Sequence, residues 1–525
     1  MSAGLPVRFF LGAGAVVLAW ILYLVGSVPA YVFSAWRFIL YDQGSYLYAV
    51  DRWQAGEVLY RDFAWQYGPL ALAWYRGFAA LGGNSPLTMV MASSVAFAAA
   101  WVLVSWLLVR VAGWIWGGVL AVAGLLPIMS QSGPLAINGP HGAVEMLLLA
   151  CCASVLSVAP ERWWRVWLLG VLAGLLQWVR FGPHAVALAA ILLIVATEAW
   201  THRTDGRSFL RQMWAFIWRL GAGYGVTVVP LIIWYFRALP AVAAWEQFWP
   251  AFMVDVYAKT FPNRWPHLGW DRVFFQEWLP AMIGVGFALA WVGKGWRRRS
   301  SHAPAPAGNA VAGLVFLPLY YAVGCGMLFH NNFTFIGHLW LAWPGLGLGA
   351  LLGWGWARVL VAALVLPILV GSGLTTRATL QRELRRPAQP LSLPNGQQLW
   401  FRPREAAQFA QFQAALNAPG KASPRLAVFL ANGGVHYFFR TQRVGRVWYF
   451  VPDMVRPWEE ATVEEDLLHS ERILVAEMGY VSAETTPGVV ALFLPLPRPM
   501  AERLLPHLRI LQHVEGVGYL VEVTP

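Results

Sequence analysis

The sequence is poor in cysteine and in charge. Its three cysteines, Cys151, Cys152 and Cys325, all lie in apolar stretches, so no disulfide framework is available on either side of a membrane. Charged residues make up 12% of the chain, against roughly a quarter in an ordinary soluble domain. These shortages exclude disulfide-rich and disordered classes, and 58% hydrophobic residues with a mean hydropathy of +0.52 indicate a membrane protein.

The signatures of familiar soluble enzymes are also missing. The chain has no HExxH, paired CxxC, GxxxxGK[ST] or DxD pattern, and Gly345, Gly347 and Gly349 fall in an apolar stretch, which argues against a nucleotide pocket. The net charge of +12 does not indicate a nucleic-acid partner, because most of the excess lies in residues 1–375, with 22 basic and 12 acidic residues. We therefore expect no nucleic acid.

Long apolar runs dominate residues 1–375. We predict about 11 transmembrane helices, at residues 9–28, 87–109, 111–129, 142–158, 166–179, 184–197, 220–236, 278–293, 310–328, 338–352 and 359–374. The segments 166–179 and 184–197 are shorter than the roughly 20 residues that a perpendicular span needs, so a tilted or re-entrant arrangement stays open there.

The loop charges predict the orientation. With a cytoplasmic N-terminus, the inner loops carry twelve Lys and Arg against two acids, as the positive-inside rule requires, while charges in the outer loops nearly cancel. An odd number of spans then places the C-terminal tail outside.

Two outer loops, residues 29–86 and 237–277, are long enough to carry function. The first begins with an amphipathic pattern suited to a helix lying in the membrane interface. We assign residues 1–375 to a transmembrane catalytic domain containing both loops.

The tail, residues 376–525, alternates helix and strand signals. Helices are expected at 403–416, 459–469 and 499–508, and strands at 425–431, 472–478 and 519–523. This pattern predicts a small soluble α/β domain. We expect this domain to pack above the outer loops rather than to perform chemistry.

Two carboxylates of the first outer loop are candidates for a general base. Asp42 follows the first span in YDQGSY, and Asp62 lies in YRDF. Proximity to lipid can raise the pKa of a carboxylate toward useful values. The alternative is that both are interfacial acids neutralised by nearby arginines.

Several outer cations and histidines are candidate substrate contacts. Ionisable groups near membrane depth are rare and usually functional, which singles out Arg180 as a site for a lipid phosphate, although an Arg that snorkels to the headgroups is an equal alternative. Lys259 and Arg264 could hold the same phosphates. His141, His330 and His338 fall at outer ends of spans as sugar or phosphate contacts, or as structural residues.

The run DQGSYLYAVDRWQAGEVLYRDFAWQYGPL, residues 42–70, resembles the first outer loop of GT-C superfamily glycosyltransferases that use polyprenyl-phosphate sugars. The resemblance is to the branch of protein O-mannosyltransferases and lipid A aminoarabinose transferases, in which an Asp on a juxtamembrane helix, often in D-[EQ]-x-x-Y, precedes G-x-x-x-Y-x-[DE] and a segment ending in Pro. The matching residues are Asp42, Gln43, Tyr46, Gly56, Tyr60, Asp62, Tyr67, Gly68 and Pro69. Gln43 stands where Glu is often paired with the Asp.

The resemblance implies a GT-C-like fold and a catalytic Asp42. Together with the predicted orientation, it implies a bacterial inner-membrane protein with a periplasmic C-terminal domain. The implied activity is transfer of a sugar from a polyprenyl-phosphate donor to a hydroxyl of a glycan, lipid or protein, with Asp62 as a second catalytic candidate and Tyr46 and Tyr67 beside the substrate. No cofactor is required by these residues, and participation of a divalent metal stays open. A secondary transporter and a non-catalytic membrane scaffold are the alternatives, although the repeated halves typical of transporters are not visible.

Overall fold

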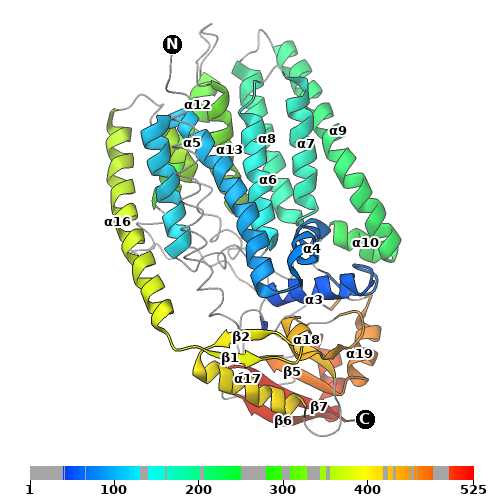
Figure 1. Ribbon diagram of the computed structural model, residues 1–525. Coiled ribbons are helices and arrows are strands. Elements are labelled where there is room, and N and C mark those ends of the chain that lie inside the picture. The colour runs from blue at the N-terminus through cyan, green and yellow to red at the C-terminus, as the bar shows by residue number, and fades with distance from the viewer. Residues whose placement is uncertain are drawn as a thin grey trace.

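The computed structural model places a bundle of long helices at one end of the molecule and a small sheet domain at the other (Figure 1). It describes residues 39–40, 42–65, 67–130, 140–159, 162–201, 206–249, 279–297, 308–327, 343–349, 355–417, 424–429, 433–447, 450, 455–456, 458–476 and 496–524. The predicted first span, 9–28, lies outside these residues.

Helix α5 (Pro86–Ser130) contains two of the predicted spans. Gly113 interrupts it with a left-handed backbone, φ 82°, so the chain bends between its two arms. The arms pack closely, because a Cβ on Gly117 would lie 2.5 Å from the Cα of Val109. One apolar stretch of 45 residues thereby forms two neighbouring helical segments.

The remaining bundle helices follow the predicted apolar runs. They are α6 (Pro140–Leu156), α7 (Trp163–Gln177), α8 (Phe181–Thr201), α9 (Gly206–Ala238), α12 (Leu279–Arg297), α13 (Gly308–Met327), η4 (Trp343–Gly345), α15 (Leu346–Gly349) and α16 (Gly355–Arg385). Within the described residues, three helical stretches are long and apolar enough to cross a membrane: Pro86–Gly124, Phe181–Thr201 and Gly206–Ala238. The predicted count of eleven is therefore not confirmed, although α8 is a full-length helix where the sequence showed only 14 clearly apolar residues.

Small residues bring α7 and α9 into close contact. A Cβ on Gly170 would lie 2.1 Å from the carbonyl oxygen of Leu220, and one on Gly223 would lie 2.0 Å from that of Trp167. Such glycines allow helix backbones to approach where a larger side chain would hold them apart. This packing fixes the C-terminal end of α7, which leads into Arg180.

Three short helices lie at the end of the bundle that faces the sheet domain. They are α3 (Asp42–Gln54), α4 (Pro69–Gly82) and α10 (Ala241–Phe248), and α3 runs crosswise between the bundle and the tail (Figure 1). The sequence pattern of α3 predicted a helix lying in the membrane interface. Instead, residues 43–50 are all buried, because protein covers α3 on both sides.

The tail is an α/β domain, as predicted. Its main sheet has the order β4-β3-β5-β7-β6, with β3 parallel to β4 and β5, and β7 antiparallel to β5 and β6. The strands are β3 (Arg425–Phe429), β4 (Gln442–Arg443), β5 (Arg472–Ala476), β6 (Leu508–Val514) and β7 (Gly518–Val523). Helices α17 (Pro403–Leu416), α18 (Gly434–Phe439), α19 (Glu460–Leu468) and α21 (Arg498–Leu504) accompany it.

The tail elements that were not predicted are the hairpin β1 (Gln389–Ser392) and β2 (Gln398–Phe401), helix α18, and strands β4 and β6. Residue 508 was assigned to the end of a helix, but α21 and the 3-10 turn η5 (Leu505–His507) stop before it, and β6 begins there. Helix α16 continues to Arg385, past the expected domain boundary at 375–376.

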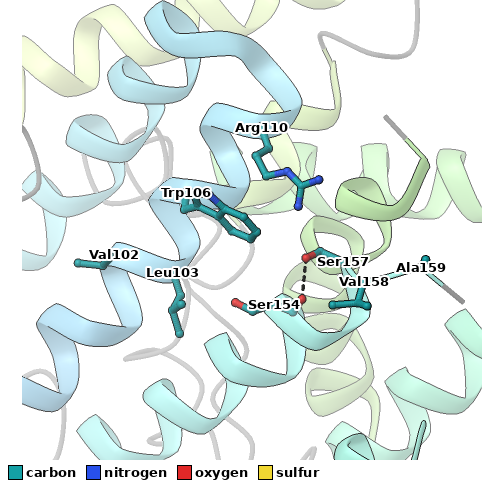
Figure 2. A pocket seen from close by; sticks show the side chains of 8 residues that line it. All are labelled: Val102, Leu103, Trp106, Arg110, Ser154, Ser157, Val158 and Ala159. Carbon is teal, nitrogen blue, oxygen red and sulfur yellow. Dashed lines mark hydrogen bonds between the residues drawn. The ribbon is translucent and has the colours of Figure 1, made fainter. Parts of the chain in front are cut away.

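At the end of the bundle away from the tail, a cavity of about 640 Å³ opens between α5 and the last turn of α6 (Figure 2). Its lining combines apolar side chains of α5 with one cation, Arg110. The candidate active site lies at the opposite end of α6.

Candidate active site

Helix α3 presents different tyrosines to the bundle and to the tail. Tyr46 contacts His141 of α6, whereas Tyr48 lies against the ring of His436 in α18, with ring centroids 5.2 Å apart. Positions four residues apart share a helix face, so the backbone of Asp42 lies on the face of Tyr46. The candidate base therefore begins α3 on the side that faces the bundle.

An aromatic cluster surrounds His141 in the first turn of α6. The Tyr46 hydroxyl and His141 Nδ1 share a hydrogen bond of 2.7 Å. Tyr67 stacks on the imidazole at 4.5 Å between centroids, and Trp65 meets Tyr46 edge to face at 4.9 Å. Three residues proposed separately from the sequence, Tyr46, Tyr67 and His141, thus belong to one cluster.

A buried ion pair lies one helical turn further along α6. Arg180 donates to Glu145 Oε2 from both Nε and a terminal nitrogen, each at 2.7 Å. The hydroxyl of Tyr320, on α13, donates to the other carboxylate oxygen at 2.9 Å. The side chain of Glu145 is 1% exposed and that of Arg180 is 15% exposed.

This pairing explains how the bundle tolerates both charges. A buried carboxylate or guanidinium alone costs several kcal/mol of desolvation, which excellent geometry and further hydrogen bonds must offset. Glu145 receives donors on both oxygens, so its negative charge is well satisfied. The two bonds from Arg180 to Glu145 hold the guanidinium in one orientation at this end of α6.

The glycines and tyrosines of the first outer loop shape the backbone that carries this cluster. Gly56 follows α3 with φ 93°, and Tyr60 also has a left-handed backbone, φ 71°, while its hydroxyl donates to the carbonyl of Tyr67 at 2.7 Å. Gly68 donates to the carbonyl of Val179 at 2.9 Å. These motif positions set the path of the loop rather than its chemistry.

Gly68 also permits the closest contact between the loop and the helix bundle. A Cβ there would lie 2.0 Å from the carbonyl oxygen of Trp178, a separation that no real side chain adopts. The next residue, Pro69, begins α4, where its missing N–H costs no helical hydrogen bond. The Gly68-Pro69 pair therefore joins the loop to the turn that carries Arg180.

Asp62 is tied into the loop. Its carboxylate accepts from Arg61 Nε at 2.8 Å and from the backbone N–H of Val58 at 2.7 Å. The hydrogen bond from Arg61 and then that from Val58 lower the pKa of Asp62 from its usual value to about 2. A carboxylate this acidic is a weak base near neutral pH, so the geometry favours a structural part for Asp62.

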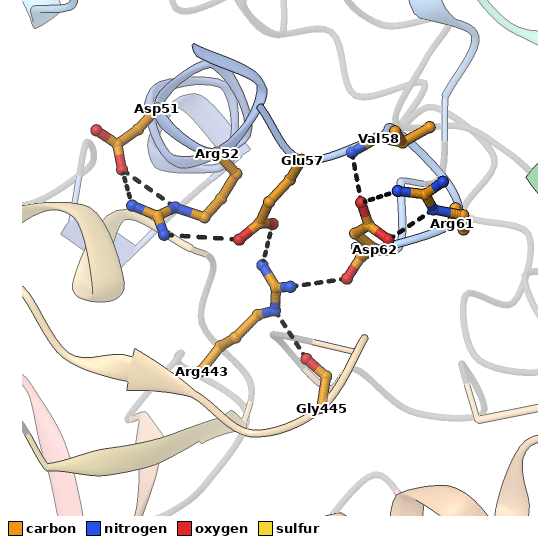
Figure 3. A network of polar contacts seen from close by, with 8 residues as sticks. All are labelled: Asp51, Arg52, Glu57, Val58, Arg61, Asp62, Arg443 and Gly445. Carbon is orange, nitrogen blue, oxygen red and sulfur yellow. Dashed lines mark hydrogen bonds and ion pairs between the residues drawn. The ribbon is translucent and has the colours of Figure 1, made fainter. Parts of the chain in front are cut away.

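The tail holds the same loop from the other side (Figure 3). Arg443, on β4, pairs with Glu57 at 2.6 Å and donates to the Asp62 carbonyl at 2.7 Å. The backbone N–H of Ala64 donates to the carbonyl of Arg446 at 3.0 Å. The expectation that the tail packs on the first outer loop is confirmed by these contacts.

The tail also reaches the start of the second long loop. Glu246, on α10, accepts from Arg456 at 3.0 Å and from the indole of Trp458 at 3.1 Å. The tail therefore contacts parts of both long loops.

The other proposed contacts cannot be placed. Lys259, Arg264, His330 and His338 lie outside the described residues, as does the side chain of Asp42. Among the side chains that are described, no group of three or more His, Cys, Asp or Glu is arranged to hold a metal ion.

Sequence reasoning assigned no role to Glu145, Tyr320 or Trp65. A tyrosine within an apolar helix is a weak signal, because Tyr is common both in membrane helices and at their ends. Glu145 was the stronger signal for this ion pair, because a carboxylate within an apolar run implies a nearby cation. Arg180, which lies between two short apolar segments, was the candidate for that cation.

Comparisons with known proteins gave matches only among solved structures. No protein-family model and no curated protein matches the sequence. The oligosaccharyltransferase of Archaeoglobus fulgidus, tethered to an acceptor peptide, is similar at 10% identity and a TM-score of 0.48, over 98% of this chain and 74% of that one.

Two further structures were solved with lipid phosphates. ArnT from Cupriavidus metallidurans, bound to undecaprenyl phosphate, is 14% identical with a TM-score of 0.47, over 99% of this chain and 98% of that one. Archaeal AglB from Archaeoglobus fulgidus, with an inhibitory peptide and a dolichol-phosphate, is 10% identical with a TM-score of 0.49, over 96% and 73%.

Proposed function

We propose that this protein transfers a sugar from a polyprenyl-phosphate donor to a hydroxyl of a glycan, lipid or protein, at the outer face of a bacterial inner membrane. One observation carries the proposal. The Asp42 position shares a face of α3 with Tyr46, and contacts continue from Tyr46 through His141 and α6 to the pair of Glu145 and Arg180. A carboxylate and a cation thus belong to the same end of the bundle, where the tail covers the first outer loop.

Asp42 and Arg180 divide the chemistry. The hydroxyl oxygen of the acceptor forms a bond to the anomeric carbon of the sugar, and the carboxylate of Asp42 takes up the hydroxyl proton. The bond between that carbon and the phosphate oxygen breaks, and polyprenyl phosphate leaves as an anion stabilised by Arg180. A single displacement inverts the anomeric configuration.

The other cluster residues differ in their access to a substrate. Tyr46 and His141 are at most 1% exposed, so they support the start of α3 from behind. Tyr67 and Arg180 are only partly buried, so we assign them the contacts with the donor. Glu145 and Tyr320 hold the guanidinium in place.

The test uses the full chain in lipid nanodiscs with a polyprenyl-phosphate sugar and a hydroxyl acceptor. We expect release of polyprenyl phosphate together with the glycosylated acceptor, of inverted configuration, and no transfer from a nucleotide sugar. Two results together would instead indicate a transporter. The protein would release no polyprenyl phosphate from the donor, and it would carry a lipid-linked sugar unchanged across the membrane.

A further inference from the structure

The cavity between α5 and α6 lies far along α6 from the proposed active site. Its lining residues are Val102, Leu103, Trp106, Arg110, Ser154, Ser157, Val158 and Ala159, and its volume is about 640 Å³. His141 and Glu145 belong to the first two turns of α6, whereas this cavity is at its C-terminal end. A ligand here is therefore independent of the proposed sugar transfer.

One stripe of α5 runs from apolar to charged along the cavity. Val102, Trp106 and Arg110 are spaced four residues apart, so they share one face of the helix. Val102 is 42% exposed and Trp106 is 47% exposed, so this face of α5 is open to lipid or to a ligand. The stripe ends at the bend of α5, beside the exposed Trp114 and Trp116.

Arg110 is the charged group of this cavity. Its guanidinium lies over the Trp106 ring, 4.7 Å from the centroid, and extends toward the end of α6 where Ser157 lies (Figure 2). Within the described part of the chain, no acidic side chain forms an ion pair with Arg110. The cavity therefore offers one positive charge fixed above an apolar wall.

The hydroxyl groups of the two serines in the cavity are not available as donors to an anion. Ser154 Oγ donates to the carbonyl of Ala150 at 2.8 Å, and Ser157 Oγ donates to that of Ser154 at 2.6 Å. Their hydroxyl hydrogens are used within α6, so binding of an anion depends on Arg110.

We propose that this cavity binds an anionic glycerophospholipid, with the lipid phosphate on Arg110 and the first part of an acyl chain along Trp106 and Val102. The positive charge selects the phosphate of an anionic lipid, and the apolar wall selects a lipid over free phosphate. Tryptophans such as Trp114 and Trp116 favour the headgroup level of a membrane, which is the depth at which a lipid phosphate lies.

The test measures lipid binding to the full chain by native mass spectrometry, with phosphatidylglycerol and phosphatidylcholine of matched acyl chains. We expect the wild type to bind one phosphatidylglycerol with at least about tenfold preference, because the choline cation of phosphatidylcholine offsets its phosphate charge beside Arg110, whereas phosphatidylglycerol keeps a net negative charge. Arg110→Gln should lose this preference. Arg76→Gln should retain it, because Arg76 also lies over a tryptophan ring, that of Trp53 at 4.4 Å, but is not part of the lining of this cavity.

A second variant keeps the proposal testable if Arg110→Gln folds poorly. Ser154→Leu fills the cavity without changing its charge and should also remove the tightly bound lipid. Equal binding of the two lipids by the wild type, or a wild-type preference in both variants, would overturn the proposal. So would displacement of phosphatidylglycerol by millimolar inorganic phosphate, because that would identify a simple anion site.

Discussion

The pair of Arg180 and Glu145 shows how one residue's burial depends on another. Glu145 alone would be an unpaired charge in the bundle, yet Arg180 and Tyr320 satisfy both of its carboxylate oxygens. The same contacts hold Arg180 in one orientation beside Tyr67 and His141. A catalytic cation needs such fixed placement, because a dipole or charge that is already oriented costs no reorganisation during the reaction.

Glu145→Gln removes the negative charge and leaves the Arg180 guanidinium buried without compensation. We expect the free energy of unfolding to fall by about 3–5 kcal/mol, the usual cost of breaking a buried pair from one side. Chemical denaturation in nanodiscs measures this change. The double variant Glu145→Gln with Arg180→Gln should lose less stability than Glu145→Gln alone.

The matched control is Glu502→Gln, which removes an acid from the exposed pair with Arg498 at 2.8 Å. It should change stability by less than about 1 kcal/mol. Equal effects of Glu145→Gln and Glu502→Gln would show that the Arg180 pair is not structurally important.

At the scale of elements, the first outer loop is held between the bundle and the tail. Gly68 joins it to the turn before Arg180, and Arg443 joins it to β4. Helix α3 is thereby covered on both sides. This arrangement gives the Asp42 position a fixed distance from the aromatic cluster, even though α3 is a short helix of 13 residues.

Gly68→Ala should disturb that junction, because its Cβ would lie 2.0 Å from the carbonyl oxygen of Trp178. The backbone must shift, and a displacement of about 1 Å can reduce the rate on the order of a hundredfold. Gly77→Ala in α4 is the control, since nothing lies within 4 Å of its Cβ. Sugar transfer by both variants measures the effect, and equal rates would contradict the proposed junction.

Arg443→Gln should loosen the contact between the tail and the loop. Its bonds to Glu57 and to the Asp62 carbonyl are charge-assisted, each worth on the order of 1.5–3 kcal/mol. Hydrogen–deuterium exchange of residues 57–64 should rise, while Arg404→Gln, which removes an exposed pair with Glu515, should leave it unchanged. Unchanged exchange in Arg443→Gln would show that the tail does not hold the loop.

The elements that were predicted correctly are those whose apolar residues recur at the spacing of a helix or a strand. Pro403–Leu416 forms a helix with the predicted bounds, and the strands at 425 and 472 begin where expected. Strand β6 was missed because it follows a 3-10 turn without a Gly or Asn signal. An amphipathic pattern cannot distinguish a helix at a lipid surface from α3, which protein covers on both sides.

The candidate site was predicted as separate residues rather than as an assembly. Tyr46, Tyr67, His141 and Arg180 were each proposed, but no spacing in the sequence relates α6 to the turn before α8. Tertiary packing brings Glu145 and Arg180 together across 35 residues of sequence. Tyr320 was missed because a hydroxyl in an apolar helix carries little information until its partner is known.

At the scale of the whole molecule, the loop, α10 and the tail lie at one end, and the bend of α5 lies at the other (Figure 1). The charge bias of the sequence predicts that these two ends lie on opposite sides of the membrane. Opposite ends of α6 then carry the two sites proposed here, one for the lipid-linked sugar and one for a membrane phospholipid.

The orientation can be tested by cysteine labelling in intact cells. A cysteine at Ser392 in β1 should react with an impermeant reagent from outside, whereas one at Gly206, at the start of α9, should react only after permeabilisation. The three native cysteines are first replaced by Ala. Labelling of both positions from the same side would contradict the proposed topology.

The catalytic role of Asp42 is tested by measuring sugar transfer by the Asp42→Asn variant. Donor binding is measured in the same preparation. Asn keeps the size of the side chain but cannot accept the acceptor's proton, so the rate should fall by about 10²–10⁴ while donor binding persists. Asp51→Asn is the control, since Asp51 lies on the same helix and pairs with Arg52 at 2.5 Å. We expect near-wild-type transfer by Asp51→Asn and loss of transfer by Asp42→Asn, whereas a wild-type rate in a folded Asp42→Asn protein would show that Asp42 is not the base.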